Sequence, residues 1–306
     1  MKFTKYAIVA LTAFAVISTA SASASTLSDF IEANAAGQGI EMKIVNFDMG
    51  TVYGNDTVGT TSNTPDTWAA GQAGPTGGVG AEDGWGIFVV SEIALSTNTA
   101  NPFYQRGNAA KGGNTELVGI FYGLQDTYVE QSGATSHIIA SVNVTFDIYE
   151  QATGAFDETA GSAARGGASV YTTVTGGTKV LTAMSAAGFL RIAGDKGGVA
   201  TEFESEFNNA GNSGSGDTYL NIVAGSGDLA DILNTNQQST AASAINGVAN
   251  SDIKIDFTTK QYVGQGDWLV QSNDPVSAHV VPLPGAASMG FGLMGLVGLA
   301  RKRRSA

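Results

Sequence analysis

The chain has no cysteine, only two histidines and only fifteen lysine and arginine residues among its 306 positions. Without cysteine, a disulfide scaffold, a thiolate metal site and a cysteine nucleophile are all excluded, so stability must come from core burial and strand pairing. His137 and His279 would have to supply any catalytic triad or zinc pair, and neither adjoins an acidic residue in the sequence. Phosphate-binding loops, dinucleotide fingerprints and metalloprotease motifs are also missing. The sequence therefore indicates no class of enzyme.

Positive charge is scarce above all in the middle of the chain. Six of the fifteen basic residues lie in residues 1–24 and 278–306, whereas all 27 acidic residues lie between those two segments. The intervening region therefore has nine basic and 27 acidic residues, a formal charge of −18. A body of this charge repels nucleic acid and anionic lipid headgroups. We expect no nucleic-acid partner, and cations are the small ligands that this charge favours.

The first residues are typical of a secretory signal peptide. Lys2 and Lys5 precede an apolar stretch from Tyr6 to Ile17, and a segment of small residues with Ala22-Ser23-Ala24 follows. Twelve apolar residues are too few to span a membrane, and the small residues fit a cleavage site. We therefore expect residues 1–24 to be removed after Ala24 and the rest of the chain to be exported.

The last residues form a three-part tail. It consists of a proline motif, an uncharged glycine-rich run from Gly285 to Ala300 and a basic cluster; the motif is Val281, Pro282, Leu283 and Pro284, and the cluster is Arg301, Lys302, Arg303 and Arg304. The two prolines favour an extended, exposed segment that suits recognition or cleavage. The uncharged run would reach about 24 Å as a helix, somewhat less than a hydrocarbon core of about 30 Å. The cations behind it would stay on the cytoplasmic side and stop transfer.

This tail resembles the PEP-CTERM sorting signals, specifically the VPLPA-CTERM variant, although Gly285 stands where that variant has alanine. The resemblance implies that an intramembrane exosortase-like protease cuts near the proline motif and discards the apolar helix. It also implies transient anchoring in the inner membrane and a final place at the cell surface or in the extracellular matrix. An ordinary single-span membrane anchor and a disordered cytosolic tail are the alternatives.

Residues 25–277 indicate a body built of many short strands. Glycine, threonine, serine and asparagine are abundant there, and turn signals recur about every dozen positions. The clearest strand is Ile138 to Ile148, in which apolar residues occupy alternate positions. Weaker strands are expected at Ile40–Phe47, Trp85–Leu95, Leu117–Val129, Ser169–Val174, Lys179–Ala187, Phe189–Ile192, Tyr219–Val223 and Ile253–Phe257.

Helices are expected only at Thr26–Ala36, with Ser28 as a cap, and at Asp228–Leu233. Antiparallel strands without intervening helices must bury one face against a second sheet. We therefore predict an all-β chain with a single antiparallel β-sandwich or jelly-roll-like domain. Its organisation would be a signal peptide at 1–24, the sandwich at 25–277 and the sorting tail, with an apolar transmembrane helix, at 278–306.

Calcium is the metal ion that the glycine-rich loops of the body would favour. The segments Gly214–Asp217 and Gly225–Asp228 both read Gly-Ser-Gly-Asp and resemble one fragment of a calcium-binding repeat. The repeat is not sustained, so two hairpin turns are the alternative interpretation. We predict no other cofactor.

Acidic and aromatic residues give two further candidate sites. Glu202, Glu204 and Glu206 alternate with other residues, which would place three carboxylates on one face of a strand. A solvated edge strand explains this stripe better than a glycosidase does, because a glycosidase places its acids across a cleft. Trp68, in a long polar segment, and Trp268 would favour a glycan-binding groove if they were exposed.

From the sequence we expect an exported, non-enzymatic surface or extracellular-matrix protein that is structural or adhesive and associated with exopolysaccharide. Its partners would be an exosortase-like protease, the inner membrane in passing, and an extracellular polysaccharide. A secreted polysaccharide hydrolase that shares the tail and a calcium-dependent glycan-binding adhesin are the alternatives. The first would require a cleft with two acids of perturbed pKa, and the second an exposed aromatic groove.

Overall fold

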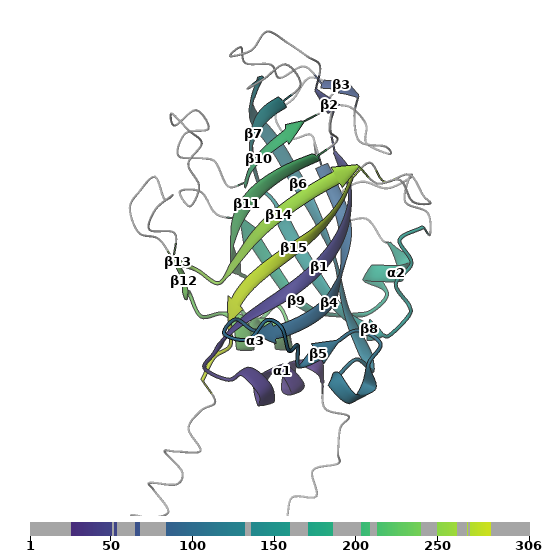
Figure 1. The fold of residues 1–306 in the computed structure, drawn as a ribbon, viewed down its shortest axis with the longest axis vertical. Helices are drawn as coiled ribbons and strands as arrows, with labels where there is room; N and C mark the ends of the chain where they lie inside the picture. Colours follow the sequence, from purple (N-terminus) through teal and green to yellow (C-terminus); the bar gives the residue numbers. More distant parts are fainter. Residues whose placement is uncertain are drawn as a thin grey trace, which may run out of the picture.

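The computed structural model describes residues 26–50, 52–53, 65–67, 84–131, 136–159, 171–185, 203–208, 213–239, 250–261, 268 and 270–282 (Figure 1). The helices are α1 (Leu27–Ala35), α2 (Thr172–Thr175) and α3 (Asp228–Leu233), with a 3-10 turn at Ala109–Lys111. The strands are β1 (Gly39–Gly50), β2 (Val52–Tyr53), β3 (Pro65–Thr67), β4 (Gly84–Leu95), β5 (Tyr104–Gln105), β6 (Thr115–Gln131), β7 (Ser136–Val142), β8 (Thr145–Ala152), β9 (Thr178–Ser185), β10 (Phe203–Asn208), β11 (Ser213–Ile222), β12 (Gln238–Ser239), β13 (Asn250–Ser251), β14 (Ile253–Gln261) and β15 (Val270–His279). This part of the chain is therefore mostly β, as expected.

The expected sandwich or jelly roll is wrong, because the main sheet closes on itself. Its strands follow the order β6, β8, β9, β11, β14, β15, β1 and β4, and β4 pairs back with β6. All these pairings are antiparallel, so the described strands form a closed eight-stranded barrel. Alternating hydrophobicity predicts strands with one buried face, and a closed barrel satisfies that pattern as well as two packed sheets do.

Two positions in the ring are each shared by two strands. β7 and β8 both pair with the long strand β6, and β9 and β10 both pair with β11. The strand expected from Ile138 to Ile148 is therefore interrupted between β7 and β8, at Asn143, which has a φ of 66°. Facing it is Gly123, with a φ of 84°, where a Cβ atom would lie 2.8 Å from the carbonyl oxygen of Asn143. Glycine is required there because the two backbones approach closely.

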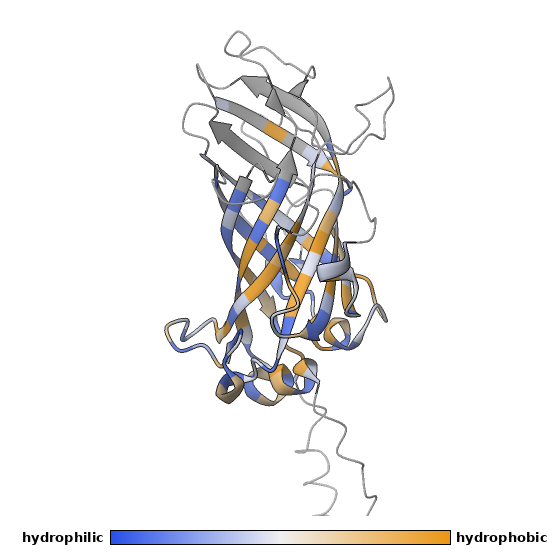
Figure 2. Cartoon of the chain, turned by 90° about the vertical axis from the view of Figure 1, so that its right-hand side faces the viewer, coloured by the Kyte–Doolittle hydropathy of each residue, from blue (hydrophilic) through white to orange (hydrophobic). Residues whose placement is uncertain are grey.

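The barrel interior is apolar at the end that α1 and α3 close. The buried cluster inside draws on residues from all eight ring strands and from both helices, including Ile31 and Ala35 of α1 and Leu229 and Leu233 of α3. Figure 2 shows hydrophobic and hydrophilic residues alternating along the strands. Helix α1 begins where we expected, but Thr26 caps it instead of Ser28: the Thr26 hydroxyl accepts from the Asp29 amide at 3.2 Å. The helices thus act as a plug that completes the core.

A second buried cluster lies on the outer face of the barrel. Trp85, Ile87 and Val89 of β4 belong to it, while Phe88 and Val90, at the alternate positions of the same strand, point into the interior. The segment with Phe156, Tyr171 and Val174 packs against this outer face. Both faces of β4 are therefore buried, which explains its nearly continuous apolar sequence.

Most of the expected elements are confirmed. The two helices are α1 and α3, and strands occupy the expected segments at 40–47, 85–95, 117–129, 179–185, 219–222 and 253–257. The strand expected at Ser169–Val174 is wrong, because helix α2 begins at Thr172. The strand expected at Phe189–Ile192 lies outside the described residues, as do most of the long polar segment 54–83, the signal peptide 1–24 and the expected apolar helix 285–300.

In the part of the chain that the structure describes, we find no helix with the length and hydrophobicity needed to cross a membrane.

The body of the protein begins and ends at the same end of the barrel. The Gly37 amide, just after α1, donates to the Val280 carbonyl oxygen at 3.0 Å. The Val281 amide donates to the Ile232 carbonyl oxygen of α3 at 2.8 Å. Strand β15 continues through His279, so the expected boundary between residues 277 and 278 falls within this strand.

Candidate functional site

Beyond the apolar core, polar side chains face the barrel interior. Along β1, Ile40, Met42 and Ile44 point into the core, and the same alternation places Asn46 and Asp48 on the interior face. Along β15, Val276 and Ala278 point inward, and the same alternation places Ser272 and Asp274 on the interior face. Along β14, Ile253 and Ile255 point inward, and Thr259 continues their face.

Strand pairing brings the polar residues of these three strands together. It aligns Asn46 with Ser272, and Ser272 with Thr259. Three neighbouring strands thus converge on one polar region, which we call the interior acid pair site after Asp48 and Asp274.

Asp274 is almost completely enclosed. Its residue is 2% exposed, one carboxylate oxygen accepts from the Thr258 amide at 3.3 Å, and the other accepts from the Ser272 hydroxyl. The β14–β15 ladder is interrupted beside this residue, next to Pro275, which has no amide hydrogen to donate. The interruption leaves the Thr258 amide available to the carboxylate. Burial nevertheless raises the pKa of Asp274 to about 7, because the hydrogen bonds from Ser272 and Thr258 offset it only in part.

Asp48 carries the less satisfied carboxylate of the two. Among the described residues, no hydrogen bond or ion pair reaches its side chain. Burial raises its pKa to about 7, and repulsion from the Asp274 carboxylate adds to the increase. Both carboxyls therefore have a pKa close to neutral pH, and each holds its proton well above the pH at which an ordinary aspartate loses it.

The Ser272 hydroxyl shows how a proton can be held there. It lies within hydrogen-bonding reach of both Asn46 Oδ1 and Asp274 Oδ2, but it has only one hydrogen to donate. A proton on Asp274 resolves the conflict, because Asp274 then donates to Ser272 while Ser272 donates to Asn46. The Ser272 amide also donates to Asn46 Oδ1, at 2.9 Å. The network therefore favours a neutral Asp274 when no cation is near.

The interior acid pair site does not have the geometry of a glycosidase. Such enzymes separate the pKa values of their acid and their nucleophile or base, whereas both aspartates here have a raised pKa. Asp274 is enclosed, and both of its oxygens already accept hydrogen bonds, so a sugar chain cannot reach them. Within the described residues, no group of three or more histidine, cysteine, aspartate or glutamate side chains is placed to hold a metal ion.

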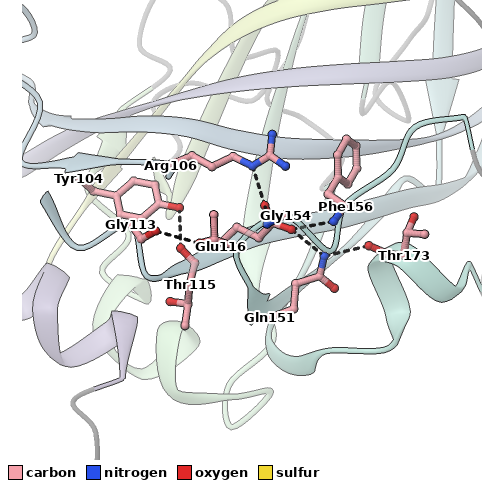
Figure 3. Close-up of polar contacts among 10 residues, drawn as sticks. Tyr104, Arg106, Gly113, Thr115, Glu116, Gln151, Gly154, Phe156 and Thr173 are labelled. Atoms are coloured by element: carbon pink, nitrogen blue, oxygen red, sulfur yellow. Dashed lines mark hydrogen bonds and ion pairs between the residues drawn. The ribbon is translucent and has the colours of Figure 1, made fainter. Parts of the chain in front are cut away.

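A second buried acid, Glu116, lies on the outside of the barrel and holds a loop in place (Figure 3). It is 0% exposed and accepts from Arg106 Nε at 2.6 Å, Gln151 Nε2 at 3.0 Å and the Phe156 amide at 2.8 Å. Burial alone would raise the pKa of Glu116, but these hydrogen bonds and one from the Gly154 amide lower it below its usual value. The bonds from the Gly154 and Phe156 amides tie the segment around Phe156 to β6, and Arg106 and Gln151 complete the set of donors, so we assign Glu116 a structural role.

The two histidines are not brought together. His279 lies at the helix-closed end, with its Nδ1 3.3 Å from Gln238 Nε2, whereas the backbone of His137 lies in β7 near the opposite end (Figure 1). Trp268 does not line an exposed groove, because its side chain is buried and only 4% of the residue is exposed. Its ring packs edge-to-face against the Trp85 ring, with 5.1 Å between the ring centroids, and its Nε1 donates to the Glu158 carbonyl oxygen. Trp68 lies outside the described residues.

The two Gly-Ser-Gly-Asp segments are not equivalent. Gly214–Asp217 lies within strand β11, while Gly225–Asp228 forms the turn that leads into α3. The hairpin-turn interpretation is therefore wrong for the first segment, and the two segments form no calcium-binding repeat. The stripe of Glu204 and Glu206 lies in β10, which pairs with both β7 and β11, so the expectation of an edge strand is also wrong. Glu202 lies outside the described residues.

The sorting motif is visible only at its first two residues. Val281 is partly buried against the core and Pro282 is exposed beside Gly37. The remaining predicted site residues lie outside the described ranges: Ala22, Ala24, Leu283, Pro284, Arg301, Lys302, Arg303 and Arg304. Sequence reasoning missed Asp48 and Asp274, and the available signal was a charged residue at an inward position of an alternating strand.

Comparison of the chain with protein-family models, with curated proteins and with solved structures found no match in any of the three.

Proposed function

We propose that this chain is a secreted, non-catalytic barrel protein that its C-terminal tail sorts to the cell surface or extracellular matrix. The observation that supports this best is the placement of the two ends of the body. Helix α1 begins at Leu27, three positions after the proposed signal-cleavage residue Ala24, and β15 ends at His279, two positions before the sorting motif. The hydrogen bond from Gly37 to Val280 holds these two ends together.

This placement suits a protein that is tethered by one end. A membrane span that follows Pro284 would hold the barrel by its helix-closed end, and the opposite end would point away from the lipid. The formal charge of −18 in residues 25–277 keeps the barrel wall away from anionic headgroups. In this arrangement the proline motif begins where the folded body ends, and an exosortase-like protease would meet it at the membrane surface.

Export in a host with an exosortase-like system tests this proposal. Replacing Arg301, Lys302, Arg303 and Arg304 by glutamine should weaken retention in the inner membrane before processing, because the stop-transfer charge is lost. Replacing Pro282 and Pro284 by alanine should preserve insertion but leave an uncut precursor in the membrane fraction. The control replaces Lys111, Lys179 and Lys260 of the body by glutamine and should be sorted like the parent chain.

Fractionation and immunoblotting of these variants give a clear decision. If the parent chain, the proline variant and the basic-cluster variant were distributed identically among the cell fractions, sorting by the tail would be contradicted. An adhesive role predicts in addition that the purified mature barrel co-sediments with extracellular polysaccharide from the same host. A barrel that stays in the supernatant at every polysaccharide concentration would argue for a purely structural role.

A further inference from the structure

We propose that the barrel cross-links two of its own strands by an ester bond between the Ser272 side chain of β15 and the Asn46 side chain of β1, with Asp274 as the general base and ammonia as the leaving group. This inference goes beyond the proposed function and does not depend on it. It concerns a chain that has no cysteine and therefore cannot join its strands by disulfides.

The nucleophile and the acyl carbon of this reaction are already in contact. The Ser272 Oγ atom lies against Asn46 Oδ1, and the register pairs these two residues directly across β1 and β15 (Figure 1). The amide carbon Cγ of Asn46 is bonded to Oδ1 at about 1.2 Å, so it lies within the roughly 3.5 Å from which a hydroxyl oxygen can attack it. Strand pairing thus holds the two reacting groups together in the folded chain.

The backbone of Ser272 prepares the Asn46 amide for attack. Its N–H group donates to Asn46 Oδ1 at 2.9 Å. An N–H donor requires an oxygen acceptor, so this bond also fixes which end of the amide faces Ser272. When Oγ adds to Cγ, negative charge moves onto Oδ1, and the same N–H group stabilises that charge as an oxyanion-hole donor does. Within the described residues, no hydrogen bond holds the amide nitrogen, which is the leaving group.

Asp274 is placed to take the proton of the nucleophile. Its Oδ2 atom contacts the Ser272 hydroxyl, which has a single hydrogen, so an ionised Asp274 accepts that hydrogen and leaves an Oγ lone pair for the attack. Burial raises the pKa of Asp274 to about 7, which makes it a better general base at neutral pH than an ordinary aspartate. Ser272 is 0% exposed and Asp274 is 2% exposed, so water has little access to hydrolyse an ester formed there.

The reaction balances without a co-reactant. Asp274 removes the Ser272 hydroxyl proton while Oγ forms a bond to Asn46 Cγ and the carbonyl electron pair moves to Oδ1. When that pair returns, the bond from Cγ to Nδ2 breaks with its electrons on nitrogen, and Asp274 gives its proton to the nitrogen. The products are one ester, one ammonia molecule and the regenerated carboxylate. Asn46 is half-buried, so the ammonia need not cross the core to reach water, where protonation to ammonium removes it from the reverse reaction.

The cross-link would join the first and the last of the described strands. Its two residues are 226 positions apart, so the bond would close nearly the whole body into one covalent loop. A loop of this kind restricts the unfolded chain and stabilises the folded one. A force on the segment that follows β15 would then be carried by a covalent bond as well as by the hydrogen bonds between β1 and β15.

Intact mass spectrometry of the folded full-length chain, denatured just before measurement, tests the proposal. The mass should be lower than the mass calculated from the sequence by one ammonia molecule, and protease digestion should give a joined pair of peptides that contain residues 46 and 272. Alkaline hydroxylamine should separate the pair and leave a hydroxamate on residue 46, because it cleaves esters and spares amides. A folded chain at the full calculated mass would overturn the proposal. Loss of ammonia without the joined peptides would also overturn it, since a succinimide at an asparagine would then explain the loss.

Variants on the two faces of β15 give the matched comparison. Ser272→Ala removes the nucleophile and Asn46→Asp removes the reactive amide, so both should keep the full mass calculated for their own sequences. Asn273→Ala and Ser277→Ala change the other face of β15 and should lose ammonia like the parent chain. Ammonia loss that persists in Ser272→Ala would overturn the assignment. The joined peptides of the parent chain decide the proposal even if one variant does not fold.

The role of Asp274 is tested by the pH dependence of the reaction. Refolding of the full-length chain from urea-solubilised inclusion bodies starts the reaction, and the fraction of joined peptides is followed over time. With a pKa of about 7, the base is ionised about a hundredfold less at pH 5 than at pH 8, so cross-linking should be about a hundredfold slower at pH 5.

The surroundings of Asp274 leave few other groups to shift this profile. Asp48 of β1 is the charged group that interacts with it. Ile44, directly opposite on β1, and the β14 residues Phe257 and Thr258 beside it do not titrate. Equal rates of cross-linking at pH 5 and pH 8 would overturn the assignment of Asp274 as the base.

Discussion

Replacing Asp48, a half-buried residue on the inward face of β1, by asparagine should stabilise the barrel at pH 8, although most substitutions destabilise a protein. The folded state raises the pKa of Asp48 from 3.8 to about 7, so the native protein keeps a proton that the unfolded chain has already lost between these pH values. Stability therefore falls as pH rises from about 4 to about 7. The loss is about 1.4 kcal/mol per pH unit for each such carboxyl, or about 4 kcal/mol over the whole interval.

Asparagine does not titrate, so the variant escapes this loss. Asp48→Asn should be more stable than the parent by up to about 4 kcal/mol at pH 8, and the difference should shrink towards zero below pH 4. Urea unfolding in the presence of a chelator, followed by tryptophan fluorescence at pH 4, 5, 6, 7 and 8, measures this difference. Asp231→Asn is the matched control and should stay within about 0.5 kcal/mol of the parent at every pH.

The comparison between parent and variant isolates Asp48 from other titrating groups. Glu116, for example, has a lowered pKa, so its contribution is present above the pKa of the unfolded chain and is lost as pH falls through the folded pKa. That slope has the opposite sign and is common to both proteins. A difference that is independent of pH, or a variant less stable than the parent at pH 8, would refute our description of the interior acid pair site.

Three further substitutions test other parts of the structure. Glu116→Gln should cost about 3 kcal/mol of unfolding free energy, because Arg106 loses its buried partner, and proteolysis should then cut first near Phe156. Trp268→Ala should cost about 3 to 5 kcal/mol in thermal melts, since this side chain is 4% exposed; a loss below 1 kcal/mol would mean that it is solvent-exposed. Gly123→Ala should destabilise more than Gly107→Ala, because both have positive φ but only the first would place a Cβ atom near another backbone.

The sequence predicted the local elements well because their signals are local. The inward residues Ile253 and Ile255 alternate with polar positions, and that period alone identifies β14. Barrel closure could not be predicted in this way, because it depends on β4 pairing with β6 in a particular register, and alternation is the same in a sandwich and in a barrel. The interruption at Asn143 was also hidden, since the apolar pattern continues on both sides of it.

The candidate site was beyond the sequence for a related reason. Asn46 and Ser272 are 226 positions apart and meet only through the pairing of β1 with β15, which also places Asp48 and Asp274 on the same inward face, with Asp48 opposite Val270 and Asp274 opposite Ile44. In the sequence, Asp48 directly follows the strand expected at 40–47, and Asp274 lies in a segment for which no strand was expected, so neither aspartate stands out from a surface residue. The expectation of an exposed groove at Trp268 was also wrong. Trp268 stands in a polar segment of the sequence, yet its side chain packs against Trp85.

The most direct test of the proposed function is the intact mass of the protein recovered from the cell surface or the medium of its native host. We predict a chain that begins at Ser25 and ends near Pro284, without the apolar run and the basic cluster that follow. A surface protein that still carries Phe291 to Arg304 would be a plain membrane-anchored protein and would contradict processing of the tail. A chain that keeps Met1 and is found only in the cytoplasm would contradict export altogether.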